Sequence, residues 1–219
     1  NVGYSWWSHD IGGHMGGDED AELYVRWIQF GCFSPILRLH STKNAFIEKL
    51  PWEFNAEIEK ILKYYIRLPH RLIPYLYSMN WKTFSENLAL IRPLYHEHPN
   101  SEEAFKWKNI YLFCTELLVA PITKPINKEI GMARREIWLP KGNWFNFFTG
   151  NYFKGNKNYV IYQNLDEIPV FARAGSIIPL QKTINDNSID NPDELEIIVF
   201  PGKSNNFDLY EDDGISQKY

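Results

Sequence analysis

The order of apolar and polar segments in residues 1–40 constrains the fold more than any other feature. Two short runs, VGYSWW at 2–7 and PILRLH at 35–40, have the composition of buried β-strands. Between them, a glycine-rich loop leads into an amphipathic segment, which predicts a helix with Asp18 as N-cap and Gly31 as its stop. Strand, helix and strand in this order form a βαβ unit with parallel strands. One unit cannot cover a parallel sheet on both faces, so we expect the α/β part to be incomplete.

The pattern changes from helical to β-rich along the rest of the chain. Apolar residues recur at helical spacing from 52 to about 88, where Pro69 and Pro74 predict two helices or one kinked helix. A short helix is expected at about 101–111. The other apolar runs are short and separated by turn-forming residues, which is typical of an antiparallel β-sandwich. The predicted strands are 116–122, 136–139, 144–148, 159–162, 170–173, 176–180, 195–200 and 207–210.

Composition excludes several classes of partner. The net charge is −4 and there is no basic run, so we expect no nucleic acid. No apolar stretch approaches the roughly 20 residues of a membrane span, so we expect no membrane partner. Cys32 and Cys114 lie in apolar surroundings and are predicted to be buried free thiols rather than a disulfide. No signal peptide is visible, which favours a cytoplasmic location, although Asn1 is not a start methionine.

Three polar groups are candidates for chemistry. His9, Asp10 and His14 share one loop, but their spacing fits no metal motif, so we predict no metal site. Arg38 and His40 alternate at the end of a strand and therefore share a face. They are either structural, with Arg38 paired to a core carboxylate and His40 hydrogen-bonded in the core, or, in a parallel barrel, part of an active site at the strand ends. The third group, YEDDG at 210–214, is predicted to be a solvated turn rather than a Ca²⁺ loop.

Several stretches in the same order carry a resemblance to one family. WSHDIGG at 7–13, ELYVRWIQFG at 22–31 and PILRLH at 35–40 resemble the seventh and eighth barrel strands of glycoside hydrolase family 31, the α-glucosidases and α-xylosidases. Further similar stretches are RLIPYLY at 71–77, RPL at 92–94, LLVAP at 117–121, PVFARAGSIIP at 169–179 and LYEDDG at 209–214.

The resemblance implies an α/β plus all-β fold. The chain is expected to form the C-terminal end of a (β/α)8 TIM barrel, about strands 7–8 and their helices, followed by an antiparallel β-sandwich. The implied domains are the barrel end at 1–88, a proximal β-sandwich domain at 89–182, and the truncated start of a distal β domain at 183–219. The polar segment 183–192 is the best linker candidate.

The resemblance also implies a function. Family members are retaining α-glycosidases, and we expect the parent protein to hydrolyse terminal α-linked glucose-type or xylose-type residues of an oligosaccharide or α-glycoside without a cofactor. Retention requires two carboxylates about 5–5.5 Å apart. The family's D-G-x-x-E-type and W-x-G-D segments, which carry them, do not occur in this sequence, so we assign no catalytic residue. The isolated chain is therefore expected to be inactive, and its partner is expected to be the missing N-terminal barrel segment.

Three positions match the sugar pocket of the family. His40 corresponds to a histidine that hydrogen-bonds a sugar hydroxyl, and Asp10 and Arg38 correspond to residues that shape the pocket floor. Trp7 and His14 complete the expected substrate-binding set, with His14 standing where many relatives have Phe. The alternative function is a non-catalytic carbohydrate-binding or structural β module, which the aromatic content of 16% would also suit.

Overall fold

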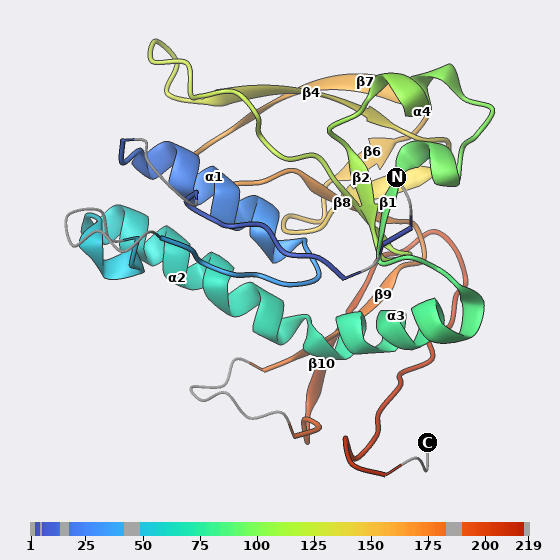
Figure 1. The fold of residues 1–219 in the computed structure, drawn as a ribbon. Helices are drawn as coiled ribbons and strands as arrows, with labels where there is room; N and C mark the ends of the chain where they lie inside the picture. The colour runs from blue at the N-terminus through green and yellow to red at the C-terminus, as the bar shows by residue number, and fades with distance from the viewer. Residues whose placement is uncertain (1–2, 5, 14–17, 42–48, 183–189, 217–219) are drawn as a thin grey trace.

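The computed structural model describes residues 3–4, 6–13, 18–41, 49–182 and 190–216. Helices cover one face of a six-stranded sheet, and a two-stranded sheet formed by residues 133–139 and 157–163 covers the other (Figure 1). The helices and 3-10 turns are α1 (Ala21–Cys32), η1 (Pro51–Glu53), α2 (Ala56–Arg71), α3 (Ile73–Glu86), η2 (Leu94–His96) and α4 (Glu102–Lys106). None of the described helices is both long and apolar enough to cross a membrane.

The predicted βαβ unit is present in reduced form. Ile11 and Leu39 form a parallel bridge on either side of α1 in the sequence, which confirms the parallel direction. Apart from the bridge residue Leu39, the described residues of 2–7 and 35–40 form no strand, so the predicted strand lengths are wrong. Glycines explain part of this, because Gly3 and Gly12 have φ of 73° and 94°, which interrupts an extended backbone.

The ends of α1 also differ from the prediction. Its N-cap is Asp20 rather than Asp18, because the Asp20 carboxylate accepts a hydrogen bond from the Leu23 amide at 2.9 Å. Gly31 does not stop the helix but lies in its last turn, where an added Cβ would come within 2.5 Å of Ile11 Cδ1. Glycine therefore allows α1 to lie directly against the bridged residues.

The prolines divide the next helical segment as predicted. Pro69 lies in the last turn of α2, and Pro74 lies in the first turn of α3. Leu72 separates the two helices, and its amide donates to the carbonyls of Leu68 and Pro69. Two helices, rather than one kinked helix, therefore form here.

The strands after α3 are antiparallel throughout. The six-stranded sheet has the order β1-β2-β3-β8-β5-β6, and β4 with β7 and β9 with β10 form two-stranded sheets. The strands are β1 (Ile91–Pro93), β2 (Tyr111–Phe113), β3 (Leu117–Val119), β4 (Ala133–Leu139), β5 (Asn143–Asn146), β6 (Tyr152–Lys154), β7 (Lys157–Gln163), β8 (Val170–Arg173), β9 (Ile177–Gln181) and β10 (Leu195–Val199).

Two sequence predictions fail in this region. The helix expected at 101–111 is only α4, and residue 111 already belongs to β2. The strand expected at 207–210 does not form, because the segment packs on α3 instead. The Phe207 ring lies 5.9 Å from that of Tyr75, and the Tyr210 amide donates to Ser78 Oγ at 3.0 Å.

Two apolar clusters fill the layers. The larger packs α1, α2 and α3 against one face of the sheet, including Leu117 and Val170. The smaller packs Leu118 and Phe171 against residues of β4. Cys32 and Cys114 are both buried and free, which confirms the prediction.

Candidate functional site

The parallel bridge brings two predicted site residues together. Asp10 precedes Ile11 and Arg38 precedes Leu39, so the bridge places Asp10 beside Arg38. The Ile11 amide donates to the Arg38 carbonyl at 3.2 Å, and Arg38 Nη2 pairs with Asp10 Oδ1. Both side chains remain accessible, with 33% of Asp10 and 52% of Arg38 exposed. The pair can therefore offer hydrogen-bonding groups to a ligand on this surface.

His40 lies at the next step of the same bridge. Its amide donates to the Ile11 carbonyl at 2.9 Å, and its own carbonyl lies so close to Gly12 that a Cβ there would come within 3.3 Å. Asp10, Arg38 and His40 therefore all lie next to the bridge between Ile11 and Leu39. We name these three residues the bridge-end cluster.

Lys49 holds the loop that carries Asp10. Its Nζ donates to the carbonyl of Gly12 and, at 3.2 Å, to that of Gly13. Tyr24 of α1 donates from its hydroxyl to the Lys49 carbonyl, and burial raises the pKa of Tyr24 to about 12. Sequence reasoning missed both residues, because each contact joins positions at least 25 residues apart.

Trp7 occupies a different environment from the bridge-end cluster. Its ring packs 5.3 Å from that of His9 and 6.1 Å from that of Phe30. Together with Tyr4 and Tyr111 it lines a hollow of about 350 Å³. The remaining predicted residue, His14, lies outside the described residues.

One large cavity shares no lining residue with the bridge-end cluster. It measures about 1000 Å³ and lies between α2, the β5–β6 turn and the loop after β7, and its lining includes none of the five predicted site residues. Cavity size alone would therefore have directed attention away from the bridge-end cluster.

The described residues include no group of three His, Cys, Asp or Glu side chains arranged to hold a metal ion. At the end of the chain, the YEDDG segment forms a turn, as predicted. Asp212 Oδ1 accepts from the Gly214 amide at 2.9 Å, and Asp213 Oδ1 accepts from the amides of Ile215 and Ser216.

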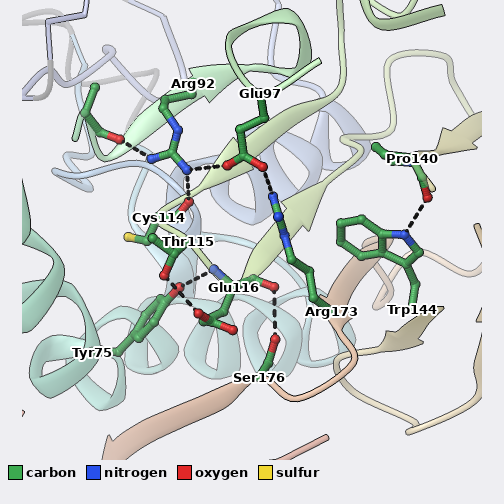
Figure 2. A network of polar contacts seen from close by, with 11 residues as sticks. Tyr75, Arg92, Glu97, Cys114, Thr115, Glu116, Pro140, Trp144, Arg173 and Ser176 are labelled. Carbon is green, nitrogen blue, oxygen red and sulfur yellow. Dashed lines mark hydrogen bonds and ion pairs between the residues drawn. The ribbon is translucent and has the colours of Figure 1, made fainter. Parts of the chain in front are cut away.

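A second polar cluster centres on Glu97, which is paired with two arginines (Figure 2). Arg92 Nη2 donates to Glu97 Oε1 at 2.8 Å and to the Cys114 carbonyl at 2.9 Å, while Arg173 donates to Glu97 Oε2. Burial acts to raise the pKa of Glu97, but the two guanidinium groups outweigh it and hold the pKa below its ordinary value. Because the carboxylate is already paired twice, we interpret this cluster as structural.

Comparison with known proteins gives matches along most of the chain. Residues 1–79 match the model of the glycosyl hydrolases family 31 TIM-barrel domain, and residues 87–178 match that of the family's C-terminal domain. An alpha-xylosidase of Saccharolobus solfataricus is 35% identical over 99% of this chain and 29% of its own length. Neutral alpha-glucosidase C of Mus musculus is 36% identical over 99% of this chain and 24% of its own length. The chain thus spans less than a third of the length of these relatives.

Solved structures agree with this similarity. The family 31 dextranase of Flavobacterium johnsoniae, complexed with glucose, superposes with a TM-score of 0.84 at 36% identity, covering 96% of this chain and 26% of that one. The family 31 alpha-xylosidase of Xanthomonas citri superposes with a TM-score of 0.76 at 33% identity, covering 89% of this chain and 21% of that one.

Proposed function

Because the chain belongs to glycoside hydrolase family 31, we propose that it supplies part of the sugar pocket of a retaining α-glycosidase whose two catalytic carboxylates lie outside these residues. In this proposal 1–88 is the end of the catalytic barrel, 89–182 a β-sandwich domain and 183–219 the start of a further β domain. The substrate is a terminal α-linked glucose-type or xylose-type residue, in line with the named activities of the relatives.

The observation that carries the proposal is the bridge between Ile11 and Leu39. In a parallel α/β barrel the ends of the strands form the active site. In this proposal the bridge-end cluster lies at such ends, since Asp10 follows the first run and Arg38 and His40 close the second. It presents a carboxylate, a guanidinium and an imidazole, which suit the hydroxyl groups of a sugar because they provide both donors and acceptors.

The chemical role of the cluster is to position the sugar. Arg38 pairs with Asp10 and restricts its rotation, so that the remaining carboxylate lone pairs keep a fixed direction. Hydrogen bonds to ring hydroxyls that strengthen as an oxocarbenium-like state forms accelerate glycoside cleavage. Bond cleavage itself needs a nucleophile and a general acid, and we propose that another part of the protein provides them.

The test compares two polypeptides with nitrophenyl α-glucoside and α-xyloside. The isolated chain is expected to release no nitrophenol, whereas a longer polypeptide that contains this chain and a W-x-G-D segment is expected to be active. In the longer polypeptide, Asp10→Asn and Arg38→Met should each lower kcat/KM by roughly 100-fold, because misplaced substrate contacts cost about that much. Arg134→Met, at an exposed surface pair, is the matched control.

Two results would overturn the proposal. One is turnover by the isolated chain at a rate comparable to that of the longer polypeptide. The other is unchanged kcat/KM in both Asp10→Asn and Arg38→Met. A longer polypeptide that binds oligosaccharides without cleaving them would favour the binding-module alternative.

A further inference from the structure

His9 makes two hydrogen bonds on opposite sides of its ring, both to the region of α1. Trp27 Nε1 lies 2.6 Å from His9 Nδ1, and Ser34 Oγ lies 3.2 Å from His9 Nε2. Ser34 Oγ in turn donates to the Phe30 carbonyl at 3.2 Å. Three side chains and one carbonyl therefore form a continuous chain of hydrogen bonds.

The directions of these bonds determine the tautomer of the imidazole. An indole nitrogen can only donate, so His9 Nδ1 must be the acceptor and carries no proton. His9 Nε2 then carries the proton and donates to Ser34 Oγ, which is free to accept because its own hydrogen is directed to the Phe30 carbonyl. A single proton arrangement satisfies every group in the chain.

Packing keeps the ring in this slot. The imidazole stacks on the Phe30 ring at 4.7 Å and 21°, and lies 5.3 Å from the Trp7 ring. Burial lowers the pKa of His9, and the neighbouring Asp10 carboxylate opposes this only in part. The side chains that pack on it from α1, Trp27 and Phe30, are uncharged. The neutral form is therefore favoured, as the bond from Trp27 requires.

We propose that His9 is a positioning residue for Asp10, fixed as the Nε2–H tautomer by Trp27 and Ser34. His9 directly precedes Asp10, so locking the imidazole against α1 fixes the backbone from which the Asp10 carboxylate extends toward Arg38. The Ile11–Leu39 bridge fixes the same segment from the other side. The inference rests on the proposed function, since it assigns the sugar-facing role to Asp10.

The first test uses the 219-residue chain and nitrogen-15 NMR of its imidazoles. The long-range couplings of His9 are expected to show the Nε2–H tautomer at neutral pH. Trp27→Phe should raise the pKa of His9, because the lost indole donor no longer opposes protonation of Nδ1. Ser34→Ala should not raise it, since Nε2–H donates to Ser34 in both protonation states. An Nδ1–H tautomer, or an unchanged pKa in Trp27→Phe, would overturn the assignment.

The second test measures kinetics in the longer, active polypeptide. His9→Phe keeps a ring to stack on Phe30 but removes the acceptor, and should lower kcat/KM by at least 10-fold. His9→Asn places an acceptor oxygen near the position of Nδ1 and should restore most of that loss. If His9 had only a structural role, replacing it would not alter the pH profile of kcat/KM. The proposal instead predicts that wild-type kcat/KM falls as His9 is protonated. The His9→Asn variant should lack this ionisation in its pH profile.

The matched control is His70→Asn, at an exposed histidine on α2, which should leave kinetics unchanged. Wild-type kcat/KM and an unaltered pH profile in both His9 variants would overturn the positioning role while leaving the proposed function intact. An inactive wild-type polypeptide would overturn the proposed function, and the positioning role with it.

Discussion

Arg26 of α1 donates a hydrogen bond from Nη1 to the carbonyl of Glu167, 2.7 Å away, in the loop between β7 and β8. The same guanidinium donates to the carbonyls of Leu165 and Asn164 at 3.3 and 3.0 Å. Gln29, one turn further along α1, donates to the Leu165 carbonyl at 2.8 Å. One buried arginine therefore satisfies the backbone of a loop that is about 140 residues away in sequence.

Arg26→Met is expected to destabilise the chain by about 3 kcal/mol. Methionine fills much of the space but leaves the loop carbonyls without their donors, and buried hydrogen bonds to a charged group contribute about 1.5–3 kcal/mol each. Urea unfolding followed by tryptophan fluorescence measures the change. Arg67→Met, at an exposed position of α2, is the control and should stay within about 0.5 kcal/mol of wild type. Equal costs for the two variants would contradict this role of Arg26.

Gly155→Ala is expected to cost more stability than Gly150→Ala. A Cβ at Gly155 would lie 2.0 Å from the Pro140 carbonyl oxygen and 2.6 Å from that of Gly142, and neither backbone atom can rotate away. Gly150 has φ of 72° but open space around it, so alanine there meets only backbone strain. We expect losses of about 3 and about 1 kcal/mol, respectively. Differential scanning calorimetry on both variants measures them, and a reversed order would contradict the steric argument.

The sequence correctly predicted those elements that depend only on residues close to one another in the chain. Pro69 and Pro74 remove backbone donors at fixed points, so the division of the helical segment follows from them directly. The residues of α1 and β7 show their periodicities within a few positions. Boundaries were less reliable, because Asp18 and Asp20 are equivalent as N-caps until the position of the Leu23 amide is known.

Contacts between distant segments could not be predicted in the same way. Phe207 and Tyr210 have strand-forming composition, but their rings pack on Tyr75 and Trp81 of α3, contacts that composition does not reveal. In the candidate site, strand ends and family resemblance pointed to Asp10, Arg38 and His40. The role of His9 depends on Trp27 and Ser34, which only the three-dimensional path of α1 brings to it.

Glu97→Gln is expected to cost about 2 kcal/mol near pH 7, because a neutral amide cannot pair with both Arg92 and Arg173. The folded-state pKa of Glu97 is lowered, so its stabilising effect is fully present above the unfolded value of about 4.3 and is lost as pH falls through the folded value. The difference between wild type and variant should therefore shrink below about pH 4. Urea unfolding from pH 7 to 3 measures it, with the exposed Glu136→Gln as control. A pH-independent difference would contradict this sign.

Trp81 and Tyr210 should couple in a double-mutant cycle. Their rings stack at 4.6 Å with an interplanar angle of 3°, and the pair joins α3 to the segment after β10. Replacing each with Leu, singly and together, should reveal a coupling free energy of about 0.5–1.5 kcal/mol. Trp81 paired with Tyr162, an exposed residue of β7, is the control and should be additive. The Tyr210 amide also donates to Ser78, so the Trp81→Leu chain should show faster amide exchange at Tyr210. If the free-energy costs of the two substitutions are additive and amide exchange is unchanged, the stack contributes nothing to docking this segment.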